Sequence, residues 1–253
     1  MITAQCFALS MDTDFCSADD TPGFWDGFWD DGYGRVRRDP DALSRRLMDA
    51  HRALWSRELP SGDVMELHPD GTYLSWNDLR LSSDSVTTFF RGPAMSDVIG
   101  ELESSMPDYR RFAEDIVRRT YVPGGAVLFP RHRNSFNQRR GIHPCIRDRW
   151  DRSLECIRRY YSGEESPLSE VLEQDARFFD LFGDFRDYVD FFLLQDCVDS
   201  RYEVISCLGP LSFEADPLPR NVDEYMTWVR SQLDLVQRRG QRMAALLART
   251  DGS

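Results

Sequence analysis

The chain has 253 residues, a formal net charge of −12 and a hydrophobic fraction of 41%, which is typical of a globular protein with one large domain or two small ones. All 31 basic residues are arginine, which excludes enzymes that depend on a P-loop, Schiff-base or kinase lysine. The six cysteines form no CxxC pair, and no apolar run approaches the ~20 residues of a membrane helix. We therefore expect a cytoplasmic protein with reduced thiols and no membrane partner.

The N-terminal residues carry no readable targeting signal. Met1 to Ser10 has neither a basic stretch nor a long apolar run, and a secretory signal needs both. Met11 is a second candidate start. We expect residues 1–11 to be a disordered leader and residues 12–253 to form a single domain.

The first half of the chain alternates helical and extended patterns. Asp39-Pro40 supplies a helix start, and apolar residues follow it at a spacing of three to four. The turn Pro69-Asp70-Gly71 separates two short alternating runs, as in a β-hairpin. The patterns predict helices over residues 40–56, 96–103 and 107–119, and strands over residues 64–68, 72–76, 79–81, 85–90 and 122–129.

The second half is mostly helical in pattern. Asn221 and Glu224 resemble a capping box at the start of the last apolar-periodic segment. The patterns predict helices over residues 146–161, 167–182, 184–198 and 221–247, with a short strand over 202–208. The expected fold is an α+β, helix-dominated single domain with a small antiparallel sheet.

Charge is distributed unevenly along the chain. Residues 12–34 hold seven aspartates and no basic residue, whereas residues 131–147 hold five arginines, two histidines and no acid. One explanation is that the two segments pair with each other in the fold. The other is that the basic segment meets an anion from outside.

The basic segment leads directly into a predicted helix and combines arginine forks with amide side chains. Such donors beside a helix start suit a phosphate group, and Phe136 can stack on a ring. The sequence therefore predicts that the Arg-rich loop 131–152 binds a phosphate-bearing ligand. This ligand is either RNA or a small molecule such as a nucleotide. The expected ligand-binding residues are Arg131, Arg133, Asn137, Gln138, Arg139, Arg140 and Arg147.

Two residues are candidates for catalysis, although the sequence does not decide whether the protein is an enzyme. Asp190 lies in an otherwise apolar stretch, and His143 lies in the basic segment. If Asp190 meets that segment, it can orient an arginine or act as a general base. The alternative is that Asp190 simply faces water or pairs with Arg186.

The sequence predicts no metal and no cofactor. His132, His143, Cys145 and Cys156 have a spacing that fits no compact zinc knuckle, and a Cys145 nucleophile beside a histidine would need a geometry that spacing cannot give. The aspartates at 26, 30 and 31 lack the pattern of an EF-hand loop.

The segment 21–34 supports an alternative function. It contains a short duplication, Gly23-Phe-Trp-Asp and Gly27-Phe-Trp-Asp, with Tyr33 close behind. Exposed aromatic residues of this kind favour protein contacts. The alternative is therefore a non-catalytic interaction module that engages a protein partner through this aromatic-acidic loop.

Several strings resemble a family of bacterial domains of unknown function. They are Asp12-Thr-Asp-Phe15, Asp20-Thr-Pro-Gly23, Leu81-Ser-Ser-Asp-Ser-Val86, Asp148-Arg-Trp-Asp-Arg-Ser-Leu-Glu-Cys156 and Asp187-Tyr-Val-Asp-Phe-Phe-Leu-Leu-Gln-Asp196. The resemblance covers about residues 12–235, and the last two strings are the most specific. Residues 24–35 look like an insertion relative to the family. The resemblance implies a single domain from a bacterial cytoplasm and carries no activity.

Overall fold

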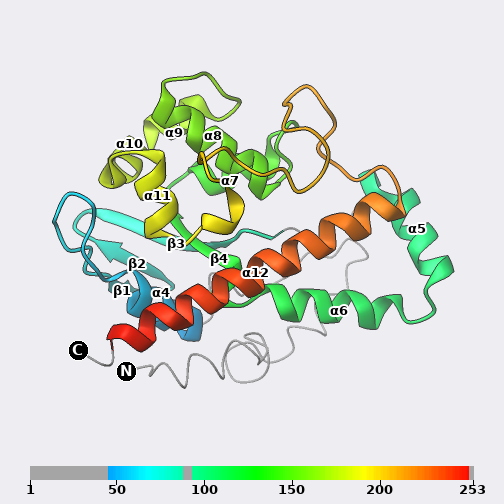
Figure 1. Cartoon of the computed structure of the whole chain (residues 1–253), viewed down its shortest axis with the longest axis horizontal. Helices are drawn as coiled ribbons and strands as arrows, with labels where there is room; N and C mark the ends of the chain where they lie inside the picture. Colours follow the sequence, from blue (N-terminus) through cyan, green and yellow to red (C-terminus); the bar gives the residue numbers. More distant parts are fainter. Residues whose placement is uncertain (1–44, 88–92, 251–253) are drawn as a thin grey trace.

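The computed structural model describes residues 45–87 and 93–250. As expected, the fold is α+β and dominated by helices, with one antiparallel sheet in the strand order β1-β2-β3-β4 (Figure 1). The strands are β1 (His68–Asp70), β2 (Tyr73–Trp76), β3 (Leu79–Ser85) and β4 (Ala126–Pro130).

Two tight turns set the register of the first three strands. Asp70 pairs with Tyr73 and Trp76 pairs with Leu79, so each connection has two residues. Gly71 (φ 65°) and Asn77 (φ 52°) adopt left-handed backbone, which such short turns require. The hairpin was predicted correctly, but its turn lies one residue later than Pro69-Asp70-Gly71 suggests, because Pro69 and Asp70 belong to β1.

Most of the helices match the sequence patterns, and their bounds are α4 (Arg45–Trp55), α5 (Ser96–Ser105), α6 (Tyr109–Thr120), α7 (Phe136–Ile142), α8 (Trp150–Ser162), α9 (Ser169–Gln174), α10 (Ala176–Phe179), α11 (Phe185–Phe191) and α12 (Val222–Thr250). Four 3-10 turns lie between them: η1 (Pro93–Met95), η2 (Pro123–Gly125), η3 (Asp180–Phe182) and η4 (Gln195–Cys197). In this part of the chain no helix is both long enough and apolar enough to cross a membrane.

Several local predictions were wrong. Of the strand expected over residues 64–68, only His68 lies in β1, and Val64 forms an isolated bridge with Glu58. The helix expected over 167–182 is divided into α9, α10 and η3, and the helix expected over 184–198 ends at Phe191 because Leu193 takes a left-handed φ of 54°. The strand expected over 202–208 is reduced to one isolated bridge between Val198 and Val204. In contrast, Asn221 does cap α12, since its Oδ1 accepts from the Glu224 N–H at 2.9 Å.

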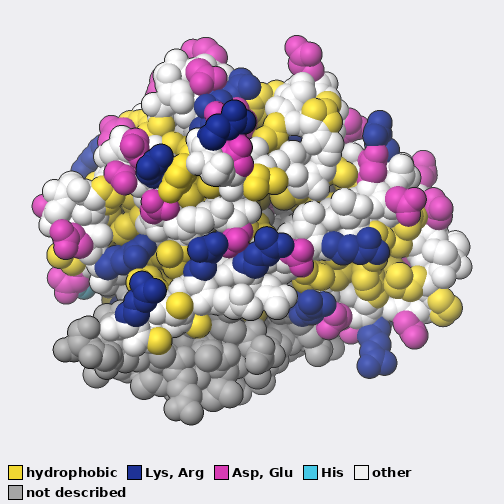
Figure 2. Space-filling view, viewed as in Figure 1, with side chains coloured by type: hydrophobic (Ala, Val, Ile, Leu, Met, Phe, Trp, Pro, Cys, Tyr) yellow, Lys and Arg dark blue, Asp and Glu magenta, His cyan; other side chains and the backbone are white. Residues whose placement is uncertain are grey.

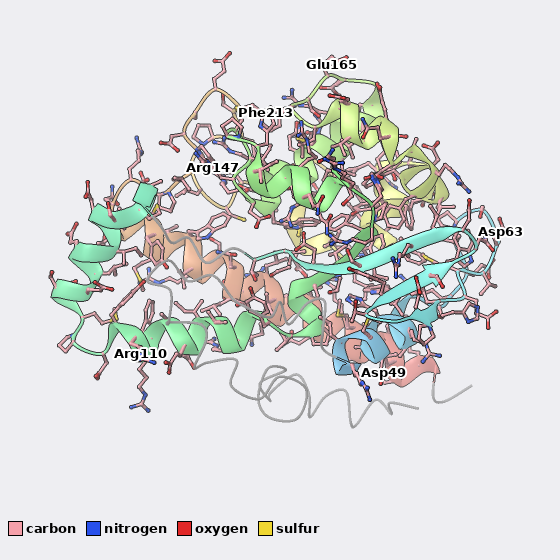
Figure 3. The ribbon with its side chains drawn as sticks, turned by 180° about the vertical axis from the view of Figure 1, so that it is seen from behind. Asp49, Asp63, Arg110, Arg147, Glu165 and Phe213 are labelled. Atoms are coloured by element: carbon pink, nitrogen blue, oxygen red, sulfur yellow. The ribbon has the colours of Figure 1, made fainter. Side chains whose placement is uncertain are left out.

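The main hydrophobic core lies between the sheet and the helices on its two sides. In Figures 1 and 3, α8 to α11 lie on one side of the sheet and α4 lies on the other. Phe129 of β4 packs against Phe136 and Trp150 at ring-centroid distances of 5.1 and 6.2 Å. The first turn of α8 is thereby fixed against the strand.

A second hydrophobic cluster lies between α5, α6 and the N-terminal half of α12, away from the sheet (Figure 1). Tyr225, Trp228 and Val229 contribute to this cluster, whereas Leu235, Val236 and Met243 of the same helix belong to the main core. The long helix α12 therefore connects the two cores.

Candidate functional site

The Arg-rich segment, residues 131–152, folds as the short helix α7, a turn and the first residues of α8 rather than as a continuous loop. His132 to Ser135 leads from β4 into α7, and residues 143–149 connect α7 to α8. Arg147 (φ 49°) and Asp148 (φ 64°) are consecutive residues in left-handed backbone, so α8 begins at Trp150 and not at Ile146 as the apolar spacing predicts. The expected ligand-binding residues divide into buried and exposed groups.

Arg140 belongs to the buried group. Its side chain is 0% exposed, and its Nη1 lies 2.8 Å from Asp84 and 3.1 Å from Asp148. Its Nε also donates to Ser153 at 3.2 Å. Burial alone would lower the pKa of Arg140, but Asp148 and Asp84 together raise it. Arg140 thus joins β3 to α8 from inside the protein, which leaves it without access to a ligand in this arrangement.

Asn137 and Gln138 also make internal contacts. The Asn137 amide donates to Ser82 of β3 at 3.3 Å and accepts from Ser135 at 2.5 Å. The Gln138 Oε1 accepts from the backbone N–H of Asn134 at 2.8 Å, which holds Asn134 in its left-handed conformation (φ 63°). Asn137, which is half-buried, and Gln138, which is exposed, therefore both use their amides to hold the backbone and neighbouring side chains of the segment.

Arg133, Arg139 and Arg147 are exposed. Within residues 45–87 and 93–250, none of the three forms an ion pair. Arg131 is half-buried, and its guanidinium carbon lies 5.5 Å from the centroid of the Tyr73 ring. The segment therefore presents three surface cations that no described acid neutralises.

One of these arginines lines a cavity of about 150 Å³ between α7 and α9. Arg139 and Asn134 come from the Arg-rich segment, and Glu170 and Gln174 come from α9. Pro167, Leu168 and Val171 complete the wall. The Gln174 amide donates to Glu170 at 3.4 Å. The cavity thus combines one cation, two amides and one carboxylate over a small apolar base.

His132 and Asp175 fix the position of this cavity. Asp175 is 2% exposed on its side chain, and it accepts from His132 Nε2 and from the backbone N–H of Phe136 at 3.0 Å. The other His132 nitrogen bonds to the Arg133 carbonyl at 2.9 Å. Burial lowers the pKa of His132, but its bond to Asp175 more than compensates and raises it. Asp175 therefore holds the start of α7 against the end of α9.

The two candidate catalytic residues lie in different environments. His143 accepts the Cys145 N–H at 3.3 Å, and burial, together with the charge of Arg139, lowers its pKa. Asp190 is exposed on α11, where it accepts from Gln195 at 2.8 Å and from the Tyr202 hydroxyl. No contact of the described residues brings Asp190 to the Arg-rich segment, so the arrangement gives no support for a reaction that uses both.

No set of three or more His, Cys, Asp or Glu side chains among the described residues converges as metal ligands. Burial raises the pKa of Cys156 to about 12, which makes its thiol a poor nucleophile or ligand at neutral pH. The aromatic-acidic loop 21–34 and the leader 1–11 lie outside the described residues, as does any pairing between residues 12–34 and the basic segment.

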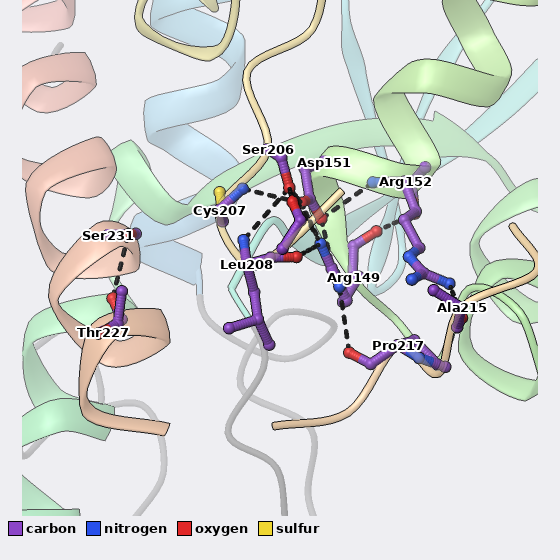
Figure 4. Close-up of polar contacts among 12 residues, drawn as sticks. Arg149, Asp151, Arg152, Ser206, Cys207, Leu208, Ala215, Pro217, Thr227 and Ser231 are labelled. Carbon is purple, nitrogen blue, oxygen red and sulfur yellow. Dashed lines mark hydrogen bonds and ion pairs between the residues drawn. The ribbon is translucent and has the colours of Figure 1, made fainter. Parts of the chain in front are cut away.

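Sequence reasoning missed the buried arginines at the start of α8. Arg149 and Arg152 are each 1% exposed. Figure 4 shows their side chains beside residues 206–217, which approach from the far end of the chain. The signal in the sequence was that both residues flank Trp150 and Leu154, the apolar residues that bury the start of this amphipathic helix. A cation taken inside with them needs internal partners.

A comparison with protein families finds a match over most of the chain. The model of a family of unknown function, DUF6994, matches residues 11–243. No curated protein and no solved structure matches the chain.

Proposed function

The chain belongs to DUF6994, a family of unknown function, and we propose that it binds a phosphate-bearing ligand in the cavity between α7 and α9. Arg139 provides the cationic contact, and Asn134 and Gln174 provide neutral hydrogen bonds. Arg133 and Arg147 add positive potential at the surface of the same segment.

The observation that carries this proposal is that Arg139 is a cation in a cavity without an acidic partner among the described residues. Arg133 and Arg147 of the same segment also form no ion pair with a described acid, but they do not line this cavity. Several other surface arginines are paired. Figure 2 shows basic side chains in a row along α12, but Arg242 lies 2.7 Å from Asp196 and Arg238 lies 3.4 Å from Asp234. An arginine with a free planar fork is well suited to bind phosphate oxygens.

The composition of the cavity favours a phosphate that is attached to a hydroxyl-bearing group. Among the described residues, Glu170 accepts one hydrogen bond, from Gln174, so it has further lone pairs that can accept from a sugar hydroxyl. A mononucleotide offers a phosphate and hydroxyls together, as does the end of an RNA strand. A protein with a net charge of −12 has no general attraction for long polyanions, which favours the small ligand.

A thermal-shift screen tests the proposal. The probes are inorganic phosphate, adenosine 5′-monophosphate and a ten-nucleotide single-stranded RNA. A ligand at 100 times its Kd adds about 2.7 kcal/mol, which corresponds to roughly 5–10 °C in a chain of this length. We expect the mononucleotide to give such a shift.

The matched variants are Arg139→Gln and Arg201→Gln, which remove the same charge. Arg201 is 81% exposed on its side chain and lies outside the Arg-rich segment. We expect Arg139→Gln to abolish the shift and Arg201→Gln to retain it. If no probe stabilises the protein, or if both variants respond like the wild type, the proposal is wrong. A response to RNA alone assigns the phosphate site to RNA.

A further inference from the structure

The segment between η4 and α12 is an ordered strap, which we define as residues 198–221. Apart from the bridge between Val198 and Val204, it contains no helix or strand. Irregular segments longer than about 12–15 residues are uncommon in compact domains and are frequently functional. The contacts that hold the strap and the space that it covers are therefore relevant to function.

Two buried arginines of α8 and its N-cap hold the strap by its backbone (Figure 4). Arg149 donates to the carbonyls of Leu208 at 2.8 Å and Pro217 at 3.3 Å. Arg152 donates to the carbonyls of Ala215 at 2.9 Å and Asp216 at 3.4 Å. The strap is thus tied down at points on both sides of residues 209–214.

The two arginines differ in how their charge is balanced. The Nε and Nη2 of Arg149 bind both carboxylate oxygens of Asp151, at 3.0 and 2.5 Å. The same edge of Arg152 has no carboxylate among the described residues. In the part of the chain that the structure describes, the Arg152 Nε has no hydrogen-bond partner and Nη2 makes one bond, at 3.4 Å to the Asp216 carbonyl, while Nη1 donates to two carbonyls.

A cavity of about 240 Å³ lies next to Arg152, between α8, the strap and the start of α12. Leu208, Pro210, Ala215 and Leu218 make its wall mostly apolar. Arg220 and Glu224, which pair with each other at 2.5 Å, also line it. Asp216 lines the cavity too, and its carboxylate accepts from the Leu218 N–H at 3.0 Å. Arg152 is therefore a cation of the lining that forms no ion pair with a described carboxylate.

A buried cation without an anion is costly, and a ligand can remove that cost. Burial and the neighbouring charge of Arg149 lower the pKa of Arg152, although Asp151 and, more weakly, Asp216 of the cavity lining oppose them. A carboxylate has two oxygens that match the Nε and Nη2 donors of an arginine, as a phosphate has, and its single charge suits a mostly apolar cavity better. An apolar wall selects a ligand whose remaining part is apolar.

We propose that this cavity binds a small monocarboxylic acid with an apolar body, whose carboxylate binds the Nε and Nη2 edge of Arg152 and whose body packs against Leu208 and Leu218. The bound carboxylate replaces the long bond from Nη2 to the Asp216 carbonyl. Because Nε is closed off from solvent, binding requires a small outward shift of the strap at residues 215–218.

Isothermal titration calorimetry with benzoate and butanoate tests the proposal. Benzyl alcohol has a similar shape to benzoate without the charge, and inorganic phosphate has charge without an apolar body. We expect both carboxylates to bind and both controls to fail. Binding of benzyl alcohol as tightly as benzoate, or of phosphate alone, contradicts the proposal.

Four variants test the site. Leu218→Trp fills the cavity and is expected to weaken benzoate binding at least tenfold, whereas Leu211→Trp places the same bulk on the strap away from the cavity lining. Arg152→Lys keeps the charge but loses the flat donor edge, and we expect a similar loss. Should Arg152→Lys fail to fold, Leu218→Trp still decides, since unchanged binding there refutes the site. Arg139→Gln must leave benzoate binding intact, which separates this site from the proposed phosphate site.

Discussion

Buried arginine side chains hold separate backbone segments of this protein together by donating hydrogen bonds to their carbonyls. Arg239 is 0% exposed and donates to the carbonyls of Phe192 at 3.0 Å, Gly124 at 2.9 Å and Ala126 at 2.7 Å. A guanidinium carries five donors in a plane, which an ammonium cannot reproduce. Charge patterning alone could not separate such interior arginines from surface ones, because the difference depends on partners far away in sequence.

Arg140 gives the first prediction at this scale. Arg140→Met leaves Asp84 and Asp148 without their buried cation, and breaking a buried pair costs about 3 kcal/mol or more. Urea unfolding is expected to show this loss. Arg177→Met, which removes one member of a pair that is 70% and 64% exposed, should change stability little. Equal effects of the two variants would show that Arg140 has no structural role.

His51 gives a pH-dependent prediction. The ring accepts from Trp55 Nε1 at 2.9 Å and therefore donates through Nε2 to Ser83 at 2.9 Å. Burial, with a smaller effect of Arg239, lowers its pKa from 6.5 to about 3. The unfolded chain binds this proton first, so stability from His51 is present above pH 6.5 and is lost as the pH falls towards 3.

The size of the His51 effect follows from linkage. One group contributes about 1.4 kcal/mol per pH unit, or roughly 2 kcal/mol between pH 6.5 and 5. We expect His51→Gln to reduce the loss of stability over this range by that amount, measured by urea unfolding at both pH values. A variant with the same pH dependence as the wild type would mean that His51 is protonated in the folded protein.

At the scale of elements, the sequence predicted where most helices lie but not where they break. The apolar pattern of residues 167–182 continues through Asp175, whose carboxylate is used by His132 and Phe136, and this long-range contact accompanies the division between α9 and α10. The segment of α7 was expected to be loop, and in the structure Phe136 is the one buried residue of its two large apolar residues, Phe136 and Ile142. Such contacts join residues that are far apart in the chain, so helix propensity and the spacing of apolar residues do not reveal them.

The crossing of η2 and α12 gives a prediction at this scale. A Cβ on Gly124 would lie 2.4 Å from the Val236 carbonyl oxygen, which is backbone and cannot move alone. Gly124→Ala is therefore expected to destabilise the protein by at least 1–3 kcal/mol, the usual cost of overpacking. Gly100 of α5 has nothing within 4 Å of its Cβ position, so Gly100→Ala should be neutral or stabilising by up to about 1 kcal/mol. Similar thermal midpoints for both variants would contradict the close crossing.

At the scale of the whole molecule, α12 joins two hydrophobic clusters. Leu102 belongs to the smaller cluster and Met243 to the main core. Because both clusters depend on one helix, we expect Leu102→Ala and Met243→Ala each to lower the stability of the entire protein by about 2–5 kcal/mol. Hydrogen exchange should then accelerate in α6 and in β4 for either variant. Acceleration confined to one cluster would show that the two unfold separately.

The sequence located the candidate phosphate site only in outline. It identified the basic segment, of which Arg139 lines the cavity between α7 and α9. It could not predict Glu170 and Gln174, because α9 reaches the segment only in the folded chain. Nor could it foresee that Asn137 and Gln138 make internal contacts with Ser82 and Asn134.

The most direct test of the proposed function is calorimetric titration of adenosine 5′-monophosphate into the wild type, Arg139→Gln and Arg201→Gln. A hydrogen-bonded contact to a charged group contributes about 1.5–3 kcal/mol, so we expect Arg139→Gln to bind at least tenfold more weakly, with Arg201→Gln equal to the wild type. Equal affinities of all three proteins, or no binding by the wild type, would contradict a phosphate site at Arg139.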